Sequence, residues 1–269
     1  TSSLCFLGLL LGDYKSPGFN RSNLFLRRIS NPPGRLTEDV LNPPGILATQ
    51  RGYGMDYLNT VHKTWVLSRF VMELDEMPLA YDRITVDTWV ENVMKFFTSR
   101  NYAIRDKSGK HYGYGRSIWA MIDTDTRQPV DILAERDGLI TKYIETDEPC
   151  PIEPFKRVKL SKAAECRRIV ETRYSDVDVN GHINSVKYIE HILDLWALDF
   201  YRTNRLQRFD IAYVAESHCG DSLHLFVEEV AEGEFCVQVM KQTPESDAGQ
   251  KADAELKEVC RCKIKFVAK

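Results

Sequence analysis

One stretch decides how this chain is organised: Tyr174-Ser-Asp-Val-Asp-Val-Asn-Gly-His-Ile-Asn-Ser-Val-Lys-Tyr188. Within it, Asp178, Asn180 and His182 occupy every second position. If the backbone is extended there, alternate side chains point to one side, so a carboxylate, an amide and an imidazole converge. An apolar pattern of helical period follows directly, at Val186, Ile189, Ile192, Leu193, Trp196 and Phe200. The stretch therefore predicts a polar triad at a helix N-terminus, where free N–H groups and the helix dipole favour negative charge.

The same residues have a simpler interpretation. Asp, Asn and Gly are turn formers, so the segment from Asp178 to His182 could be only a loop ahead of a helix. Asn184 or Ser185 would then serve as the N-cap of that helix. Spacing alone leaves both interpretations open, because short motifs match by chance.

The chain around this stretch consists of two halves with one plan. In the first half, a candidate helix at residues 46–58 precedes strand-like runs at 65–74, 83–93, 96–105 and 112–122. In the second half, a helix at 185–200 precedes runs at 208–216, 222–230, 235–241 and 259–267. Apolar residues alternate with charged ones along the last run, which predicts one face packed on a helix. Each half is thus a helix followed by an antiparallel meander, and the fold class is α+β.

A proline-rich linker is expected to separate these halves. Residues 1–34 match neither half and stay unassigned, residues 35–148 form the first domain and residues 164–269 the second. Residues 149–163 are the predicted linker, because three prolines between Pro149 and Pro154 favour an extended, semi-rigid connection.

Two local features qualify this plan. Pro43-Pro44 stands where the first helix is expected, so that helix is either interrupted or starts after the second proline. The apolar run from Leu4 to Gly12 is shorter than the ~20 residues that a membrane span needs. We therefore expect no membrane span and a cytoplasmic protein.

Composition narrows the classes of function. The chain has 269 residues, of which 43% are hydrophobic, and a net charge of −3, which argues against a nucleic-acid-binding protein. Its seven cysteines lack the spacing of a metal site or a disulfide framework, so reduced, buried thiols are expected. Motifs of P-loop proteins, zinc proteases and α/β-hydrolases are missing from the sequence.

At the stretch quoted first, the chain resembles the acyl-acyl carrier protein (acyl-ACP) thioesterases, particularly their bacterial branch. The family pattern Asp-x-Asp-x-Asn-x-His-x-Asn-x-x-Lys-Tyr is matched from Asp176 to Tyr188. A second match is Tyr213-Val-Ala-Glu-Ser-His-Cys-Gly-Asp221, and a third covers residues 64–69, 86–90 and 117–127. Plant relatives carry Cys after the acid, where this chain has Ser217, which weakens a cysteine-nucleophile mechanism.

The resemblance implies a tandem (double) hotdog, with two antiparallel sheets that join into one layer, each wrapped around a long helix. The first domain would hold the acyl-chain pocket and the second the catalytic residues. Asp178, Asn180, His182 and Glu216 match the catalytic positions. No metal or organic cofactor is implied, and a monomer or a homodimer would suit the fold.

Each of these four residues has a plausible task. Glu216, expected at the end of an apolar strand, would be partly desolvated and act as general base. His182 can move protons near neutral pH, and Asn180 can hold water or the thioester carbonyl. Asp178 would orient a neighbour or serve as the base itself. Backbone N–H groups at the start of the following helix are the candidates for the oxyanion site.

The histidine and cysteine that follow Glu216 receive other interpretations. His218 is close enough in sequence to remain undecided. Cys219 is expected to be a small buried hydrophobic residue.

The expected partner is an acyl carrier protein, which is acidic, so a basic docking patch is required. The candidate residues are Arg202, Arg205, Arg208, Lys187, Lys156, Arg157 and Lys159. Two other functions stay open: an acyl-CoA thioesterase of the hotdog fold, and a non-catalytic acyl-binding hotdog protein.

Overall fold

A computed structural model describes residues 22–27, 36, 40–41, 43–79, 82–161, 163–244 and 256–269. Of the unassigned N-terminal segment, residues 22–27 form a strand, and the apolar run at Leu4–Gly12 lies outside the described residues.

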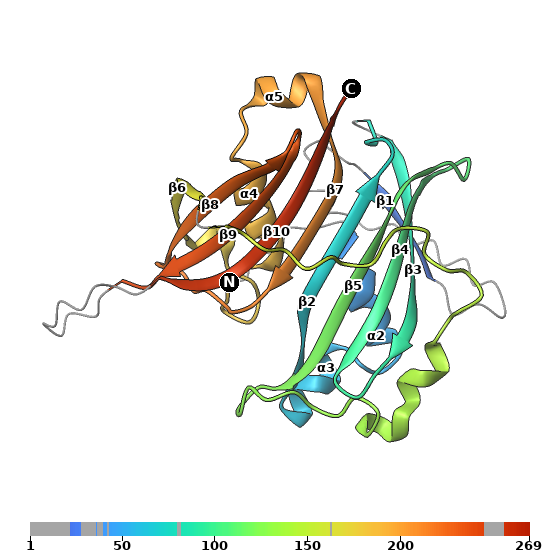
Figure 1. Ribbon diagram of the computed structural model, residues 1–269. Coiled ribbons are helices and arrows are strands. Elements are labelled where there is room, and N and C mark those ends of the chain that lie inside the picture. The colour runs from blue at the N-terminus through green and yellow to red at the C-terminus, as the bar shows by residue number, and fades with distance from the viewer. Residues whose placement is uncertain are drawn as a thin grey trace, which may run out of the picture.

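All strands of the described chain form one antiparallel sheet (Figure 1). Its ten strands are β1 (Ser22–Arg27), β2 (Lys63–Leu74), β3 (Arg83–Val93), β4 (Phe97–Asp106), β5 (His111–Asp123), β6 (Glu165–Glu171), β7 (Asn204–Tyr213), β8 (Ser222–Ala231), β9 (Glu234–Gln242) and β10 (Lys257–Ala268). Their spatial order is β1-β3-β4-β5-β2-β7-β10-β9-β8-β6. The halves join where β2 pairs with β7, from Arg69 opposite Ala212 to Glu73 opposite Arg208. The continuous layer confirms the double hotdog arrangement.

All eight predicted strands are present, and their ends differ from the prediction by at most four residues. The edge strands β1 and β6 were not predicted. β6 reads Glu-Cys-Arg-Arg-Ile-Val-Glu and is exposed along nearly its whole length, so it lacks the apolar alternation that marks a half-buried strand.

The prediction of one long helix in each half was wrong, because both helices are divided. The first half has α2 (Pro43–Gln50) and α3 (Met55–Leu58), separated by a turn in which Gly52 adopts a φ of 78°. The second half has α4 (Ser185–Leu193) and α5 (Leu198–Thr203). 3₁₀ turns lie at Asn59–Val61 (η1), at Tyr174–Asp176 (η3) and within Glu135–Tyr143 (η2), which is kinked at residues 136–138.

The proline pair does not interrupt α2, which begins at Pro43. A proline is tolerated in the first turn because its missing N–H would have no partner within the helix anyway. Leu36, Val40 and Leu41, which precede this turn, are also helical and buried.

The hydrophobic core lies between the sheet and the helices. In Figure 1, α2, α3 and α4 all lie behind the sheet. The buried face of α4 carries the predicted apolar pattern, including Ile189 and Ile192. Trp196 and Phe200 extend this pattern past the break and pack on Phe266, with ring centroids 4.9 and 5.0 Å away. Full burial of a side chain such as Ile189 or Ile192 stabilises the fold by roughly 1.5–3 kcal/mol.

The linker crosses the opposite face of the sheet, in front of the strands in Figure 1. Cys150 and Ile152 are buried against Val71 and Trp89 of the sheet. The Arg116 guanidinium donates to the backbone carbonyls of both linker residues, at 2.7 and 3.1 Å. The linker is therefore fixed to the sheet by side-chain packing and hydrogen bonds. No helix within the described ranges is long and apolar enough to cross a membrane.

Candidate functional site

His182 and Glu216 come together at the start of α4. The Nε2 atom of His182 lies 3.5 Å from Oε2 of Glu216. Their side chains are 26% and 37% exposed, so a substrate can reach both. Two of the four predicted site residues thus form a pair from segments more than thirty residues apart in sequence.

The segment that carries His182 is a turn, so the prediction of an extended backbone was wrong. Val177 and Ile183 form an isolated antiparallel bridge, and Gly181 between them has a φ of 82°. Asp178 Oδ1 accepts hydrogen bonds from the backbone N–H groups of Asn180 and His182, at 2.8 and 3.2 Å. The carboxylate of Asp178 therefore shapes the turn that presents the other two residues.

The alternative of a loop ahead of a capped helix describes the backbone correctly. The Asn184 side chain accepts a hydrogen bond from Val186 N–H at 3.0 Å and caps α4. Asn180 is exposed in the same turn, on the solvent side.

Glu216 lies in a loop, three residues beyond the end of β7 at Tyr213, so its predicted place at a strand end was wrong. Lys241 Nζ donates to the Glu216 carbonyl at 2.7 Å, and Ile183 N–H donates to the Ser217 carbonyl at 2.9 Å. These bonds tie the loop to β9 and to the turn before α4. The loop also brings the His218 ring to 5.1 Å from the His182 ring, edge to face.

Arg127 is a further site residue, and it comes from the other half of the chain. Its guanidinium forms an ion pair with Oε1 of Glu216. Arg127 sits in the turn after β5 with a φ of 60°, a left-handed conformation that is uncommon for a residue other than glycine. Arg127 is the last residue of the matched segment 117–127 described under the sequence. Nothing in the sequence pattern connects it with Glu216.

Four of the backbone N–H groups around the start of α4, the predicted oxyanion site, donate hydrogen bonds within the chain. Ile183 N–H donates to the Ser217 carbonyl and Asn184 N–H to the Asp176 carbonyl. Val186 and Lys187 N–H both donate to Asn184, to its side chain and its carbonyl respectively. Of the two predicted side-chain donors, His182 lies beside Glu216, and Asn180 is exposed in the turn.

The serine and cysteine next to Glu216 differ sharply in exposure. Ser217, at the position of the plant cysteine, is 0% exposed, so its hydroxyl cannot reach a thioester. Cys219 is exposed, contrary to the prediction. Cys150, Cys236, Cys260 and Cys262 are buried as expected, and burial raises the pKa of each of these thiols.

A cavity of about 230 Å³ lies in the first half, between α2 and the sheet. Most of its walls are apolar or aromatic, as a slot for a hydrocarbon chain requires. The lining residues are Leu41, Gly45, Ala48, Arg51, Tyr53, Trp65, Val90, Thr98, Arg100, Trp119, Ile140 and Tyr143.

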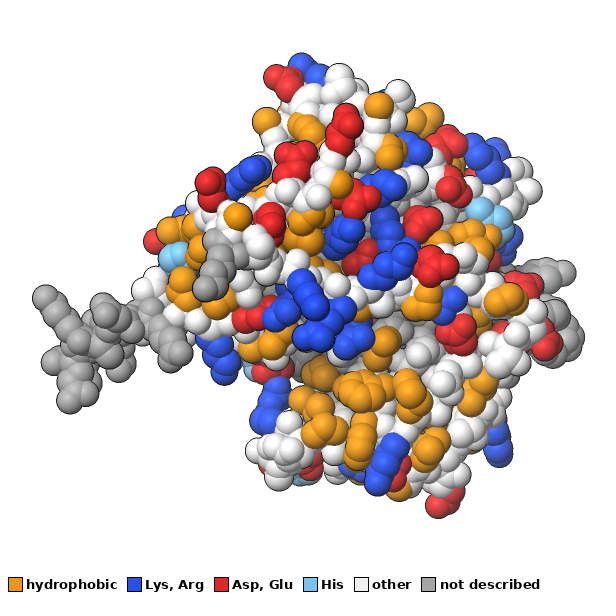
Figure 2. Space-filling view, in the orientation of Figure 1, with side chains coloured by type: hydrophobic (Ala, Val, Ile, Leu, Met, Phe, Trp, Pro, Cys, Tyr) orange, Lys and Arg blue, Asp and Glu red, His pale blue; other side chains and the backbone are white. Residues whose placement is uncertain are grey.

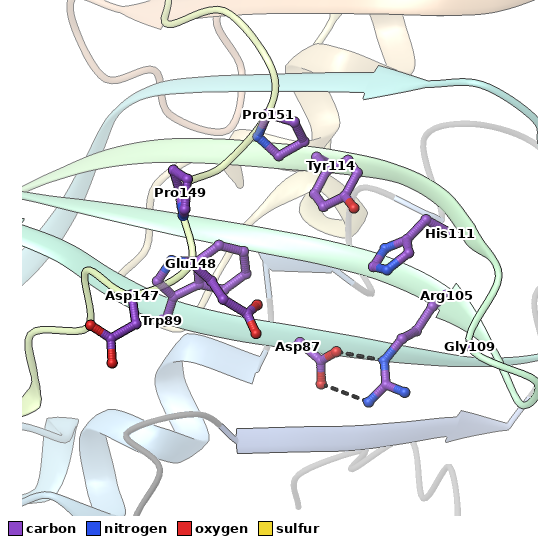
Figure 3. A pocket seen from close by; sticks show the side chains of 10 residues that line it. All are labelled: Asp87, Trp89, Arg105, Gly109, His111, Tyr114, Asp147, Glu148, Pro149 and Pro151. Carbon is purple, nitrogen blue, oxygen red and sulfur yellow. Dashed lines mark hydrogen bonds and ion pairs between the residues drawn. The ribbon is translucent and has the colours of Figure 1, made fainter.

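A second cavity, of about 570 Å³, lies on the opposite face, where the linker leaves η2 (Figure 3). Asp87 and Arg105 form a two-pronged ion pair on its floor, at 2.6 and 3.2 Å. The His111 ring stacks on Tyr114, with centroids 4.9 Å apart. This cavity is open and polar, so it is unsuited to an acyl chain.

The predicted basic clusters differ in how far their charges are compensated. Arg208 pairs with Glu73 and Asp210, and Arg202 pairs with Asp199. In contrast, Lys156, Arg157 and Lys159 of the linker are exposed. Basic side chains gather in Figure 2 across the middle of the face that the linker crosses in Figure 1.

No group of three or more His, Cys, Asp or Glu side chains that could hold a metal ion occurs among the described residues.

Comparison with known proteins gives consistent matches over both halves. Profiles of the acyl-ACP thioesterase N-terminal domain and C-terminal domain match residues 47–139 and 160–264. The crystal structure of an acyl-ACP thioesterase from Bacteroides thetaiotaomicron is 43% identical, with a TM-score of 0.80, over 92% of this chain and 98% of that one.

Plant enzymes are more distant relatives. The 12:0-ACP thioesterase from Umbellularia californica shares the fold, with a TM-score of 0.77 at 18% identity, over 93% of this chain and 98% of that one. The chloroplastic palmitoyl-acyl carrier protein thioesterase of Arabidopsis thaliana is 31% identical over 160 residues, which are 58% of this chain. The match spans only 38% of that relative's length.

Proposed function

The chain belongs to the acyl-ACP thioesterase family, and we propose that it hydrolyses the thioester of an acyl-ACP to release a free fatty acid. This reaction would end chain elongation in fatty acid synthesis. The observation that carries the proposal is the convergence of His182, Glu216 and Arg127 from three separate segments of a double hotdog. A non-catalytic acyl-binding protein has no need for such a cluster.

Hydrolysis requires that water attack the thioester carbonyl carbon and that the carbon–sulfur bond then break. We assign Glu216 the role of general base, which takes a proton from the attacking water. Its carboxylate is held between Arg127 and His182. His182, whose Nε2 atom lies 3.5 Å from Glu216, would pass this proton on to the departing thiol sulfur, so that both side chains return to their starting states. Asn180 and His182 would donate hydrogen bonds to the carbonyl oxygen as it gains negative charge. The products are a fatty acid and the free thiol of the carrier.

Asp178 is the weaker candidate for the base. One of its carboxylate oxygens already accepts two backbone hydrogen bonds within the turn. Its proposed task is to position Asn180 and His182, and its loss would act through them.

The acyl chain would occupy the cavity of the first half, whose Trp65 and Trp119 lie on β2 and β5 near the turn that carries Arg127. The carrier would dock on the exposed linker cations Lys156, Arg157 and Lys159, since acyl carrier proteins are acidic. The two repeats supply both members of a hotdog pair, so a monomer suffices for the site.

The test is release of free thiol from a panel of acyl-ACPs and the matching acyl-CoAs. Wild type is compared with Glu216→Gln and His182→Ala, each checked for folding by circular dichroism and thermal unfolding. Hydrolysis that prefers the ACP substrates and falls at least a hundredfold in both variants is expected. Preference for acyl-CoA would favour an acyl-CoA thioesterase, and acyl binding without turnover a non-catalytic binding protein.

A further inference from the structure

The cavity of the first half carries a positive charge that a hydrocarbon chain cannot use. Arg100 of β4 lines this cavity. So does Thr98, which lies two residues earlier on the same face of the strand. Its Nη1 atom donates to the hydroxyl of Thr88, a neutral acceptor, at 3.2 Å. No carboxylate forms an ion pair with Arg100 among the residues that the structure describes. Burial lowers the pKa of Arg100 to about 10, which is still far above neutral pH, so the guanidinium is charged there.

Strand register places Arg100 at the end of the cavity that is farther from the catalytic turn. On β4, Thr98 lies opposite Trp119 of β5, and Arg100 lies opposite Ser117 of β5. Asp123, at the end of β5, adjoins the turn that carries Arg127. Ser117 is six residues from Asp123, roughly 20 Å along an extended strand. A chain whose thioester lies near Glu216 would therefore meet Arg100 with a distal part.

The floor beyond Arg100 is closed. Tyr102 follows on the same strand face, is 0% exposed, and its hydroxyl lies 2.9 Å from that of Ser117. The guanidinium thus marks the inner end of the accessible space.

The helical wall of the cavity, opposite the sheet, carries small side chains. Leu41, Gly45 and Ala48 share one side of the helix and line the cavity. Among the described residues, no atom lies within 4 Å of the position that a Cβ on Gly45 would take. One turn further on, the guanidinium of Arg51 lies 4.4 Å from the centre of the Tyr143 ring and adds a second cation to the lining.

A methyl-ended chain gains nothing from such an end wall, because it displaces water from guanidinium N–H donors and offers no acceptor in return. A carboxylate offers two oxygens in the geometry that a guanidinium matches with two parallel hydrogen bonds. The walls in between stay apolar, which suits the methylene part of the chain.

We propose that the inner end of this cavity is a subsite for the carboxylate of an acyl chain that is oxidised at its far end, with Arg100 as its hydrogen-bond donor. The preferred substrate class is then an ω-carboxyacyl thioester. This inference rests on the proposed thioesterase function, of which it specifies the substrate.

The test compares two ACP thioesters of equal chain length, one ending in a methyl group and one in a carboxylate. For each enzyme, kcat/KM for the carboxylate-ended substrate is divided by kcat/KM for the methyl-ended one. The variants are Arg100→Met, which keeps the length of the side chain without its charge, and Arg100→Lys, which keeps the charge without the two-pronged geometry. Arg83→Met, at the exposed first position of β3, is the control.

We expect the ratio to fall about tenfold or more in Arg100→Met, to fall less in Arg100→Lys, and to stay unchanged in Arg83→Met. If the ratio in a folded Arg100→Met variant equals that of wild type, the subsite is overturned.

Binding of free acids separates this inference from the proposed function. A dicarboxylic acid and the monocarboxylic acid of equal length are titrated calorimetrically into wild type and Arg100→Met. Selective loss of dicarboxylic acid binding in the variant supports the subsite even if no thioester is hydrolysed. Equal loss or retention of both acids overturns it.

Discussion

Arg127, in the turn after the last strand of the first repeat, forms an ion pair with Glu216, in the loop after β7 of the second repeat. The contact depends on the pairing of β2 with β7, which joins the two repeats into one sheet. Neither repeat contains this site by itself. The tandem arrangement therefore has a direct consequence for the proposed chemistry.

We predict that Arg127→Met lowers kcat about tenfold or more, because the Glu216 carboxylate loses the cation that holds it in place. Both side chains are about 40% exposed, so the loss of folding stability should stay below about 1 kcal/mol. Steady-state kinetics and thermal unfolding measure the two effects. Arg127→Lys keeps the charge and should recover part of the activity. Full activity in Arg127→Met would show that the ion pair has no part in the reaction.

Paired amide substitutions distinguish the two carboxylates. Glu216→Gln should lower kcat by roughly 10²–10⁴-fold, since an amide cannot accept the proton of the attacking water. Asp178→Asn should cost far less, because its amide oxygen can still accept the N–H groups of Asn180 and His182. Single-turnover hydrolysis of an acyl-ACP measures both. The reverse order of effects would make Asp178 the base.

A nucleophile next to Glu216 can be tested by removal. Ser217→Ala combined with Cys219→Ala should retain hydrolysis within a few-fold, because Ser217 is fully buried and the contact between Glu216 and His182 involves neither residue. The measurement is kcat together with mass spectrometry of the quenched enzyme. A covalent acyl adduct on either residue of the wild type would refute the assignment of water as the nucleophile.

Strand positions were predictable because alternation of apolar and polar residues reports burial directly, as at Cys260, Cys262 and Ile264 of β10. The catalytic turn was harder to predict. Alternating polar residues from Asp178 to His182 look like a strand, yet an aspartate that accepts two backbone hydrogen bonds and a glycine with positive φ turn the chain back. Arg127 could not be assigned, since its partner depends on how two sheets join.

Carrier docking gives a prediction about salt and charge. Replacing Lys156, Arg157 and Lys159 by Glu should raise KM for an acyl-ACP while kcat stays close to wild type, because these exposed linker side chains have no assigned part in the chemical step. The effect should weaken as salt screens the surface charges. The same changes at Arg202 and Arg205, whose guanidiniums already have partners within the chain, are the comparison. An equal effect of both sets would argue against a specific docking site.

The last prediction concerns His191 on α4. Its side chain is 16% exposed, and its Nε2 atom lies 3.8 Å from Asp176, too far for a hydrogen bond. Burial lowers the pKa of His191, and the opposing effect of Asp176 is smaller. The charged groups around it are Asp176, Asp194, Lys187 and Arg168.

Because the folded state binds this proton less readily than the unfolded state, the free energy of unfolding should fall as pH drops below about 6.5, the ordinary pKa of histidine. Above that pH, this histidine should contribute no pH dependence. Denaturant unfolding between pH 7.5 and 5 should therefore show a shallower loss of stability in His191→Gln than in wild type. His191→Asn, a second neutral replacement at the same position, should follow His191→Gln. Identical slopes in all three proteins would show that His191 is protonated equally well in the folded and unfolded chain.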